Sequence, residues 1–352
     1  MLAAFRLDSG IHSGAGHMGR SLTLARELQN QGFEIAIFSR RQPGSLDASA
    51  QLSGAKQFWM GEEGPKMGDQ LWTENEQIAD RELFLKSLGR QTVDLLVVDH
   101  YGLSAPFESQ ISAKKVFVFD DFCQAQHCSD FILNQAGGSE AEYKNHNQNP
   151  SVQVLLGPKY ALVSPQVRVA RSRYSCANKS QGILYFGSGQ VGSYILETLP
   201  YLKDHGKRSF TVILSSEDPH FSQVKERISS LPGWELHSRV ENFPQLMESS
   251  ALFVGANGAT SWERCCIGIP TLSFTLAENQ KGIEKILKES GAGAALGDFG
   301  KESLALLPEA LSQLSDPTFV QEVVARSQKL CDGHGAERIV SEILKTGISY
   351  SS

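Results

Sequence analysis

Short apolar runs alternate along the chain with segments in which apolar residues recur at helical spacing. In the first part, such runs predict strands at 2–7, 33–39, 95–99, 116–120 and 131–134. Helical spacing predicts a helix at 18–31, followed by Gly32 at its end, and another at about 70–90. Nearly continuous apolar strands separated by helices are typical of parallel sheets that are buried on both faces.

The pattern fades at about 157–180, where the residues are basic and polar without clear periodicity, and then resumes. The second part has predicted strands at 183–186, 210–214, 234–237, 252–255 and 271–274. Predicted helices lie at 193–203, 221–229, after Asn242, and at 261–267, 279–289, 301–314, 318–330 and 336–344. We therefore predict an α/β protein with one Rossmann-like domain at 1–165, a second at 166–335, and a terminal helix within 336–352.

Composition narrows the class of protein. The 352 residues are 41% hydrophobic and carry a formal net charge of -6 without a basic run, which argues against a nucleic-acid partner. The start of the chain has no secretory pattern, and no apolar stretch is long enough to enter a bilayer. The six cysteines are scattered, so we expect reduced thiols in a cytoplasmic protein.

The first predicted strand leads into Gly14, Gly16 and His17, at the start of a predicted helix. Glycines allow a tight turn and close approach of a ligand, while a helix N-terminus disfavours the imidazolium form, leaving a neutral ring that can accept a proton. The alternative is a histidine that only packs beside the loop. Asp8 is predicted either to orient His17 or a substrate hydroxyl, or to serve in the turn. No acidic residue ends the second strand, which argues against NAD.

Polar residues also follow the strands at 95–99 and 116–120. Both groups are expected at the same sheet edge as His17, where Asp99, His100 and Tyr101 would bind sugar hydroxyls or relay protons. Asp120 and Asp121 are adjacent and point to opposite faces, so they form a poor chelate, and capping is the expected role of Asp121. The nearby cysteines and histidine lack a second ligand pair, so we predict no metal and no cofactor.

A second strand-to-helix corner contains Gly258, Thr260, Ser261 and Glu263. Its amides and hydroxyls suit phosphate, and Glu263 is placed to accept ribose hydroxyl protons. A capping box between Thr260 and Glu263 has the same spacing and remains open. Asn279 and Gln280 follow the next strand and would bind sugar groups, or Asn279 would cap the helix. An earlier glycine loop at 187–189 lacks the lysine of a P-loop.

The chain resembles the hydrolases of bacterial pseudaminic acid biosynthesis, which cleave UDP-2,4-diacetamido-2,4,6-trideoxy-β-L-altropyranose, and more widely the MurG-like glycosyltransferases. The matching motifs run in family order to about residue 290. They are Gly14-x-Gly16-His17 with Arg20-Ser21-Leu22-Thr23-Leu24-Ala25, Val98-Asp99-His100-Tyr101-Gly102, Asp120-Asp121, Leu133-Asn134, Gly157-Pro158-Lys159-Tyr160-Ala161-Leu162, Gly255-Ala256-x-Gly258-Ala259-Thr260-Ser261-Trp262-Glu263-Arg264-Cys265-Cys266 and Ala277-Glu278-Asn279-Gln280.

The resemblance implies a GT-B fold, two Rossmann-like domains with parallel sheets facing across a cleft, with the last helix returning to the first domain. It implies that UDP lies on the second domain, with Glu263 on the ribose and Gly258, Thr260 and Ser261 on the diphosphate. His17 is expected to activate the water that attacks the anomeric carbon with inversion. Substrate contacts are expected from Asp8, Gly16, Tyr101, Asn279 and Gln280.

The implied protein is a monomeric UDP-sugar hydrolase whose partners are substrate and water, on the route to flagellin glycosylation. A glycosyltransferase of the same fold is the alternative, since it needs the same nucleotide contacts and a base. Only the transferase needs an acceptor groove and often an apolar membrane-facing patch, and we see no such patch in the sequence.

Overall fold

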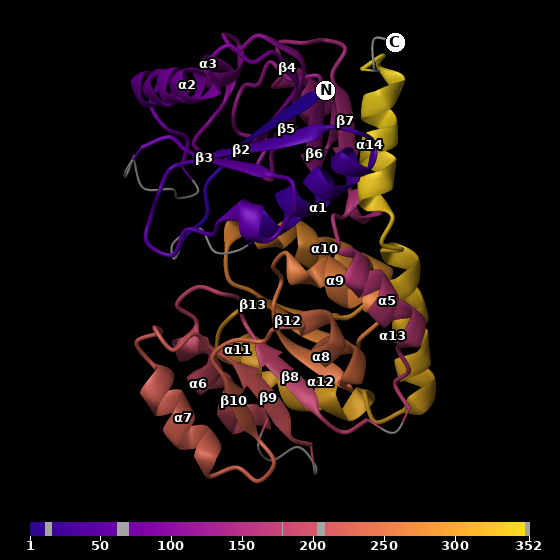
Figure 1. Cartoon of the computed structure of the whole chain (residues 1–352). Helices are drawn as coiled ribbons and strands as arrows, with labels where there is room; N and C mark the ends of the chain where they lie inside the picture. Colours follow the sequence, from indigo (N-terminus) through magenta and orange to yellow (C-terminus); the bar gives the residue numbers. More distant parts are fainter. Residues whose placement is uncertain (11–15, 62–69, 178, 203–207, 349–352) are drawn as a thin grey trace. The chain divides into compact units, whose positions relative to one another are not determined.

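The computed structural model describes residues 1–10, 16–61, 70–177, 179–202 and 208–348. The chain forms two compact units (Figure 1). Unit 1 comprises Met1–Leu162 and His334–Ser352, and unit 2 comprises Val163–Gly333. Each unit has its own parallel sheet and its own apolar core.

Unit 1 is built on a seven-stranded sheet in the order β3-β2-β1-β4-β5-β6-β7, with every neighbouring pair parallel. The strands are β1 (Leu2–Leu7), β2 (Glu34–Ser39), β3 (Lys56–Trp59), β4 (Val93–Asp99), β5 (Ala113–Phe119), β6 (Phe131–Asn134) and β7 (Gln153–Leu156). The order reverses at β1 and β4, so their carboxyl ends border the place where open α/β sheets bind ligands.

Helices cover both faces of this sheet. They are α1 (Gly16–Asn30), α2 (Glu74–Leu88), α3 (Ala105–Glu108), α4 (Glu140–Asn145) and α14 (Gly335–Lys345), with short 3₁₀ turns η1 (Ala48–Ala50) and η2 (Pro158–Tyr160). Along β4, Leu95 and Val97 face the core formed with α1 and α14, and Leu96 faces the core formed with α2 and α3. The chain thus returns from unit 2 to place α14 beside α1 (Figure 1).

Unit 2 repeats the plan with a six-stranded parallel sheet in the order β10-β9-β8-β11-β12-β13. The strands are β8 (Gly182–Tyr185), β9 (Phe210–Ile213), β10 (Glu235–His237), β11 (Leu252–Ala256), β12 (Thr271–Thr275) and β13 (Ala294–Asp298). The reversal here lies between β8 and β11, and the loop after β11 is the second corner singled out in the sequence.

The helices of unit 2 pack on both sides of its sheet. They are α5 (Pro165–Arg173), α6 (Gly192–Leu202), α7 (Phe221–Ser229), α8 (Phe243–Ser249), α9 (Thr260–Ile267), α10 (Lys281–Ser290), α11 (Lys301–Ala305), α12 (Leu307–Gln313) and α13 (Pro317–Leu330), with η3 (Glu278–Gln280) before α10. Residues of α6, α7, α11 and α12 share one core with the sheet, while α5, α8, α9 and α13 contact one another.

Most predicted elements are confirmed, and the differences are specific. The sequence did not predict the strands β3, β7 and β13 or the short helices α3 and α4. It also did not predict the helix α5, which occupies a stretch that was interpreted as patternless. The predicted helix at 301–314 is two helices, because α12 begins anew at Leu307 with Pro308 in its first turn. Asn242 does cap α8, since its side chain accepts the Gln245 amide at 3.1 Å.

Candidate active site

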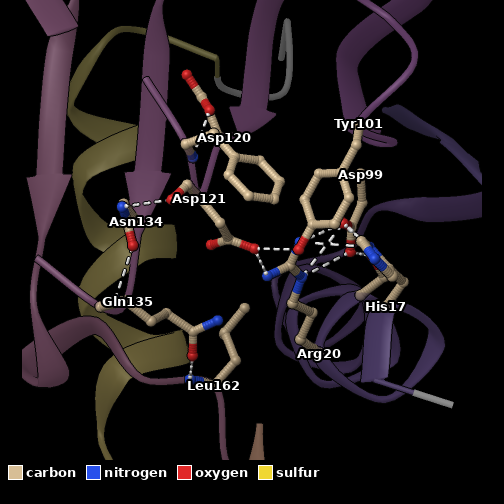
Figure 2. A network of polar contacts seen from close by, with 12 residues as sticks. His17, Arg20, Asp99, Tyr101, Asp120, Asp121, Asn134, Gln135 and Leu162 are labelled. Carbon is tan, nitrogen blue, oxygen red and sulfur yellow. Dashed lines mark hydrogen bonds and ion pairs between the residues drawn. The ribbon is translucent and has the colours of Figure 1, made fainter. Parts of the chain in front are cut away.

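His17 stands in the first turn of α1, immediately after a segment that includes Gly14 and lies outside the described residues. His17 is 8% exposed, and its Nδ1 lies 2.5 Å from Oδ1 of Asp99, the last residue of β4. The two residues are far apart in sequence but meet because β1 and β4 are neighbours in the sheet and α1 follows β1 directly. Figure 2 shows this contact within a wider polar network.

Asp99 is completely buried and ionised. Burial alone would raise the pKa of its carboxyl, but Arg20 and His17 outweigh that effect and hold the pKa well below its usual range. An ionised carboxylate only accepts hydrogen bonds, so Nδ1 of His17 is the donor. In the neutral ring, Nε2 then carries the lone pair, which is the form that a general base requires.

Arg20, one turn further along α1, joins Asp99 to a second carboxylate. It binds Asp99 with Nη2 at 2.6 Å and Nε at 3.0 Å, and it binds Oδ2 of Asp121 with Nη1 at 2.7 Å. The two carboxylates and one guanidinium therefore carry one net negative charge while His17 is neutral.

Tyr101 completes this network, which is drawn in Figure 2. Its hydroxyl donates to Oδ2 of Asp121 at 2.6 Å, and its ring meets the His17 ring edge-on with centroids 4.7 Å apart. Burial and the nearby Asp121 carboxylate raise the pKa of Tyr101 well above its usual value, so the hydroxyl keeps its proton. The structure thus brings together two of the predicted site residues, His17 and Tyr101.

The structure corrects the expectation for Asp120 and Asp121. Asp121 does not cap the following segment, because its carboxylate is engaged by Arg20 and Tyr101. Asp120 accepts the backbone N–H groups of Phe122 at 3.0 Å and Cys123 at 2.9 Å instead. Arg20 and Asp121 both lie in motifs that carry the resemblance, and Asp121 was expected at this edge, but neither was predicted to form a network with His17. Arg20 could have been found by its position one helical turn after His17.

Asp8 lies in a separate, fully buried cluster, and the carboxylate that orients His17 is Asp99. Asp8 pairs with Arg6 at 2.6 Å, accepts the backbone N–H of Arg40 at 2.7 Å and lies 3.2 Å from Nε2 of His100. Asp80 of α2 forms a second ion pair with Arg6, at 2.7 Å. This cluster ties the ends of β1 and β4 to α2, which keeps the neighbouring Asp99 in place.

In unit 2, the corner between β11 and α9 forms without the alternative capping box. The N-cap residue is Ala259, whose side chain cannot cap, and Thr260 already lies in the first helical turn. Gly258 and Thr260 are partly exposed, whereas Ser261 is buried, with its hydroxyl bound to Arg264 at 2.5 Å. An ideal Cβ on Gly258 would meet no atom within 4 Å, so there is open space beside this part of the loop.

Glu263 follows one turn into α9 and is largely buried. Burial raises the pKa of its carboxyl to about 7. Burial and the nearby Glu263 likewise raise the pKa of Tyr185, at the end of β8, to about 12. A carboxyl whose charge changes near neutral pH is typical of functional sites.

Asn279 and Gln280 lie in η3, before α10. Gln280 uses Oε1 to accept the backbone N–H of Leu276 at 2.9 Å, so it supports the turn after β12. Oδ1 of Asn279 is buried without a hydrogen-bond partner among the described residues, and Asn279 does not cap α10. Asn279 therefore retains an acceptor for a further donor.

Over the described ranges, no three histidine, cysteine or acidic residues cluster so that they would hold a metal ion. Likewise, none of the helices in the described part of the chain has both the length and the apolar character needed to cross a bilayer.

Solved structures share the two-unit plan, although their sequences are remote. MurG of Acinetobacter baumannii matches with a TM-score of 0.62 at 12% identity, covering 98% of this chain and 99% of that one. Phytolacca americana UGT2, complexed with UDP-2fluoro-glucose and pterostilbene, matches with a TM-score of 0.65 at 13% identity, over 98% and 99%. The UDP-GlcNAc 2-epimerase of Neisseria meningitidis matches with a TM-score of 0.60 at 12% identity, over 98% and 99%. The predicted GT-B fold class is thereby confirmed.

Sequence relatives are closer but still distant. The spore coat polysaccharide biosynthesis protein SpsG of Bacillus subtilis is 23% identical over 298 residues, which is 82% of each chain. The UDP-2,4-diacetamido-2,4,6-trideoxy-beta-L-altropyranose hydrolase of Campylobacter jejuni is 23% identical over 263 residues, covering 73% of this chain and 85% of that protein. No protein-family model matches the chain.

Proposed function

We propose that this protein is an enzyme that acts on UDP-sugars and hydrolyses a UDP-linked 2,4-diacetamido-2,4,6-trideoxy sugar to UDP and the free sugar. The observation that carries the proposal is the His17–Asp99 pair at the carboxyl edge of the first sheet. The hydrolase from Campylobacter jejuni and the UDP-bound solved structures support the substrate class.

The proposed reaction is a single displacement by water. Nε2 of His17 takes a proton from water, whose oxygen attacks the anomeric carbon while the bond from that carbon to the diphosphate oxygen breaks. The electron pair of that bond leaves with UDP, and the sugar configuration inverts. Asp99 holds the ring and stabilises the imidazolium, as its fixed hydrogen bond at 2.5 Å allows.

The nucleotide is assigned to unit 2. Glu263 accepts the ribose hydroxyl protons, and the partly exposed residues Gly258 and Thr260 at the β11–α9 corner take the diphosphate, with Ser261 in support. Oδ1 of Asn279, which has no partner among the described residues, is placed to accept a hydrogen bond from the substrate, and Gln280 stabilises the neighbouring turn. In unit 1, Gly16 and Tyr101 are the proposed sugar contacts, and Asp8 belongs to the buried cluster at the end of β1.

A glycosyltransferase is the second candidate, because MurG and a plant enzyme holding a UDP-sugar analogue share the fold. In a transferase the acceptor hydroxyl takes the place of water, and the same base removes its proton. The two candidates therefore differ in one observable: only a hydrolase releases UDP rapidly when no acceptor is present.

The test is a panel of UDP-sugars, including the diacetamido trideoxy sugar, incubated with the protein without acceptor while UDP is measured. We expect release of UDP, with kcat reduced roughly 100-fold or more in His17→Ala and in Asp99→Asn because each removes the oriented base. UDP affinity should stay within about twofold in both variants, because neither residue contacts the nucleotide in this account.

Asp94→Asn is the matched control, because Asp94 lies at the other end of β4 and pairs with Lys114. It should turn over substrate like the wild type. If UDP release requires an added acceptor, the protein is a transferase and the proposed hydrolysis is wrong. Full activity in His17→Ala would show that His17 is not the base.

A further inference from the structure

Two arginines are almost completely buried, one in each unit, and their surroundings differ. Arg6, at 0% exposure, is paired with Asp8 and Asp80 through charged contacts of 2.6–2.7 Å. Arg264, at 1% exposure, forms no ion pair among the described residues. The neighbouring Glu263 acts on Arg264 electrostatically without a direct ion pair. A buried cation without a directly bound carboxylate is costly, so its presence calls for a reason other than stability.

The contacts of Arg264 place it beneath the corner that follows β11. Nη2 donates to the backbone oxygen of Ala256 at 2.9 Å and to Oγ of Ser261 at 2.5 Å. Ala256 ends the strand and Ser261 lies in the first turn of α9, so one nitrogen joins both ends of the loop at 257–260. The guanidinium carbon lies 4.4 Å from the centre of the Phe253 ring, over which the guanidinium packs.

The rest of the Arg264 guanidinium is not satisfied by protein. Nε and Nη1 are buried and have no hydrogen-bond partner among the described residues. Burial lowers the pKa of Arg264 to about 10, which still leaves it protonated at neutral pH. The positive charge beneath the loop therefore adds to the partial positive charge at the start of α9.

We propose that Arg264 is a positioning residue for the diphosphate of a nucleoside diphosphate: it ties the loop at 257–260 between β11 and α9 and places beneath it a positive charge that no carboxylate among the described residues contacts directly. This inference rests on the proposed function, because it assumes that the corner receives the nucleotide. The attraction between Arg264 and a bound anion would offset the energetic cost of burying the charge. The same charge would stabilise the diphosphate as it leaves the sugar.

The test compares binding of UDP and of uridine, which lacks phosphate, by calorimetry on the full chain. The variants are Arg264→Met, which removes the charge and the donor, and Arg264→Gln, which keeps a donor without the charge. We expect each to weaken UDP binding about tenfold to a hundredfold, the usual weight of a charged hydrogen bond, and to leave uridine within about twofold. Arg264→Lys, which keeps the charge, should lose less than either.

Thermal unfolding supplies the structural control. Arg264→Met should melt at the wild-type temperature or above it, because it removes a buried charge that no carboxylate among the described residues contacts directly. Arg6→Met should melt lower, because it leaves the buried carboxylates of Asp8 and Asp80 without their partner. Equal losses for UDP and uridine, or a fall in melting temperature like that of Arg6→Met, would overturn the role of Arg264. Binding of neither ligand by the wild type would overturn the proposed nucleotide site itself.

Discussion

At the scale of single residues, Asp99 orients the His17 ring through a hydrogen bond, and Arg20 joins Asp99 to a second carboxylate, Asp121. The sequence placed His17 and Asp99 at one sheet edge, because both follow buried strands of a parallel sheet. The hydrogen bond between His17 and Asp99 could not be predicted from the sequence. Side-chain rotamers and strand order decide which polar side chains meet at such an edge. The capping role expected of Asp121 was wrong for the same reason.

Glu263 yields a residue-scale prediction about pH. Because burial raises the pKa of its carboxyl to about 7, Glu263 is protonated below neutrality and ionised above it. If the ionised form accepts the ribose hydroxyl protons, uridine and UDP should bind roughly tenfold more tightly at pH 8 than at pH 6. Calorimetric titrations across this range measure the dependence directly.

Glu263→Gln is the control, because its amide does not titrate and the phosphate of UDP titrates equally in both proteins. Its uridine affinity should be nearly constant with pH. An identical pH dependence in the wild type and the variant would show that Glu263 does not govern nucleotide binding.

At the scale of elements, the three strands that the sequence analysis missed are all edge strands. β3 and β7 are the edges of the first sheet, and β13 is an edge of the second. An edge strand has one partner and is only partly covered, so it does not need the continuous apolar run that revealed the central strands. β3 is exposed or half-exposed along its length, and β13 contains alanine and glycine in place of large apolar residues.

The helix α5 was missed for a related reason. Its sequence is rich in arginine and has only Val167 and Ala170 fully buried, three residues apart on one face. Its arginines are partly structural, since Arg171 donates to the backbone oxygens of Cys266 and Cys331 at 2.9 and 3.0 Å. A helix held by such polar contacts carries a weak hydrophobic pattern.

His127 gives an element-scale prediction, because it links α3 to the loop that follows β5. Burial would lower the pKa of His127, but Glu108 at 2.6 Å and Asp120 at 3.5 Å outweigh it and raise the pKa to about 10. A raised pKa in the folded state stabilises the fold fully below the unfolded value of about 6.5. That contribution, roughly 1–3 kcal/mol for charged hydrogen bonds, is lost as pH rises toward 10.

The measurement is urea unfolding of the wild type and of His127→Gln at several pH values from 6 to 10. The difference in the free energy of unfolding between the two proteins should shrink as pH rises. A difference that stays constant, or grows, would show that His127 is not held as an imidazolium between the two carboxylates.

At the scale of the whole molecule, the fold defines a broad class and the side chains define the chemistry. Glycosyltransferases and an epimerase share the two-unit plan at 12–13% identity, so the fold does not decide between hydrolysis and transfer. The sequence was sufficient for this plan because both central sheets consist of buried apolar strands. We propose that a histidine of unit 1 transfers the proton and that the corner of unit 2 binds the nucleotide.

The most direct test of this account is hydrolysis of the UDP-sugar in ¹⁸O-labelled water, with the released UDP examined by mass spectrometry. Attack of water on the anomeric carbon leaves the bridging oxygen with the nucleotide, so the account predicts unlabelled UDP, formed at a rate that collapses in His17→Ala. UDP carrying one ¹⁸O would show that water attacks phosphorus instead, and it would contradict the mechanism at its central step.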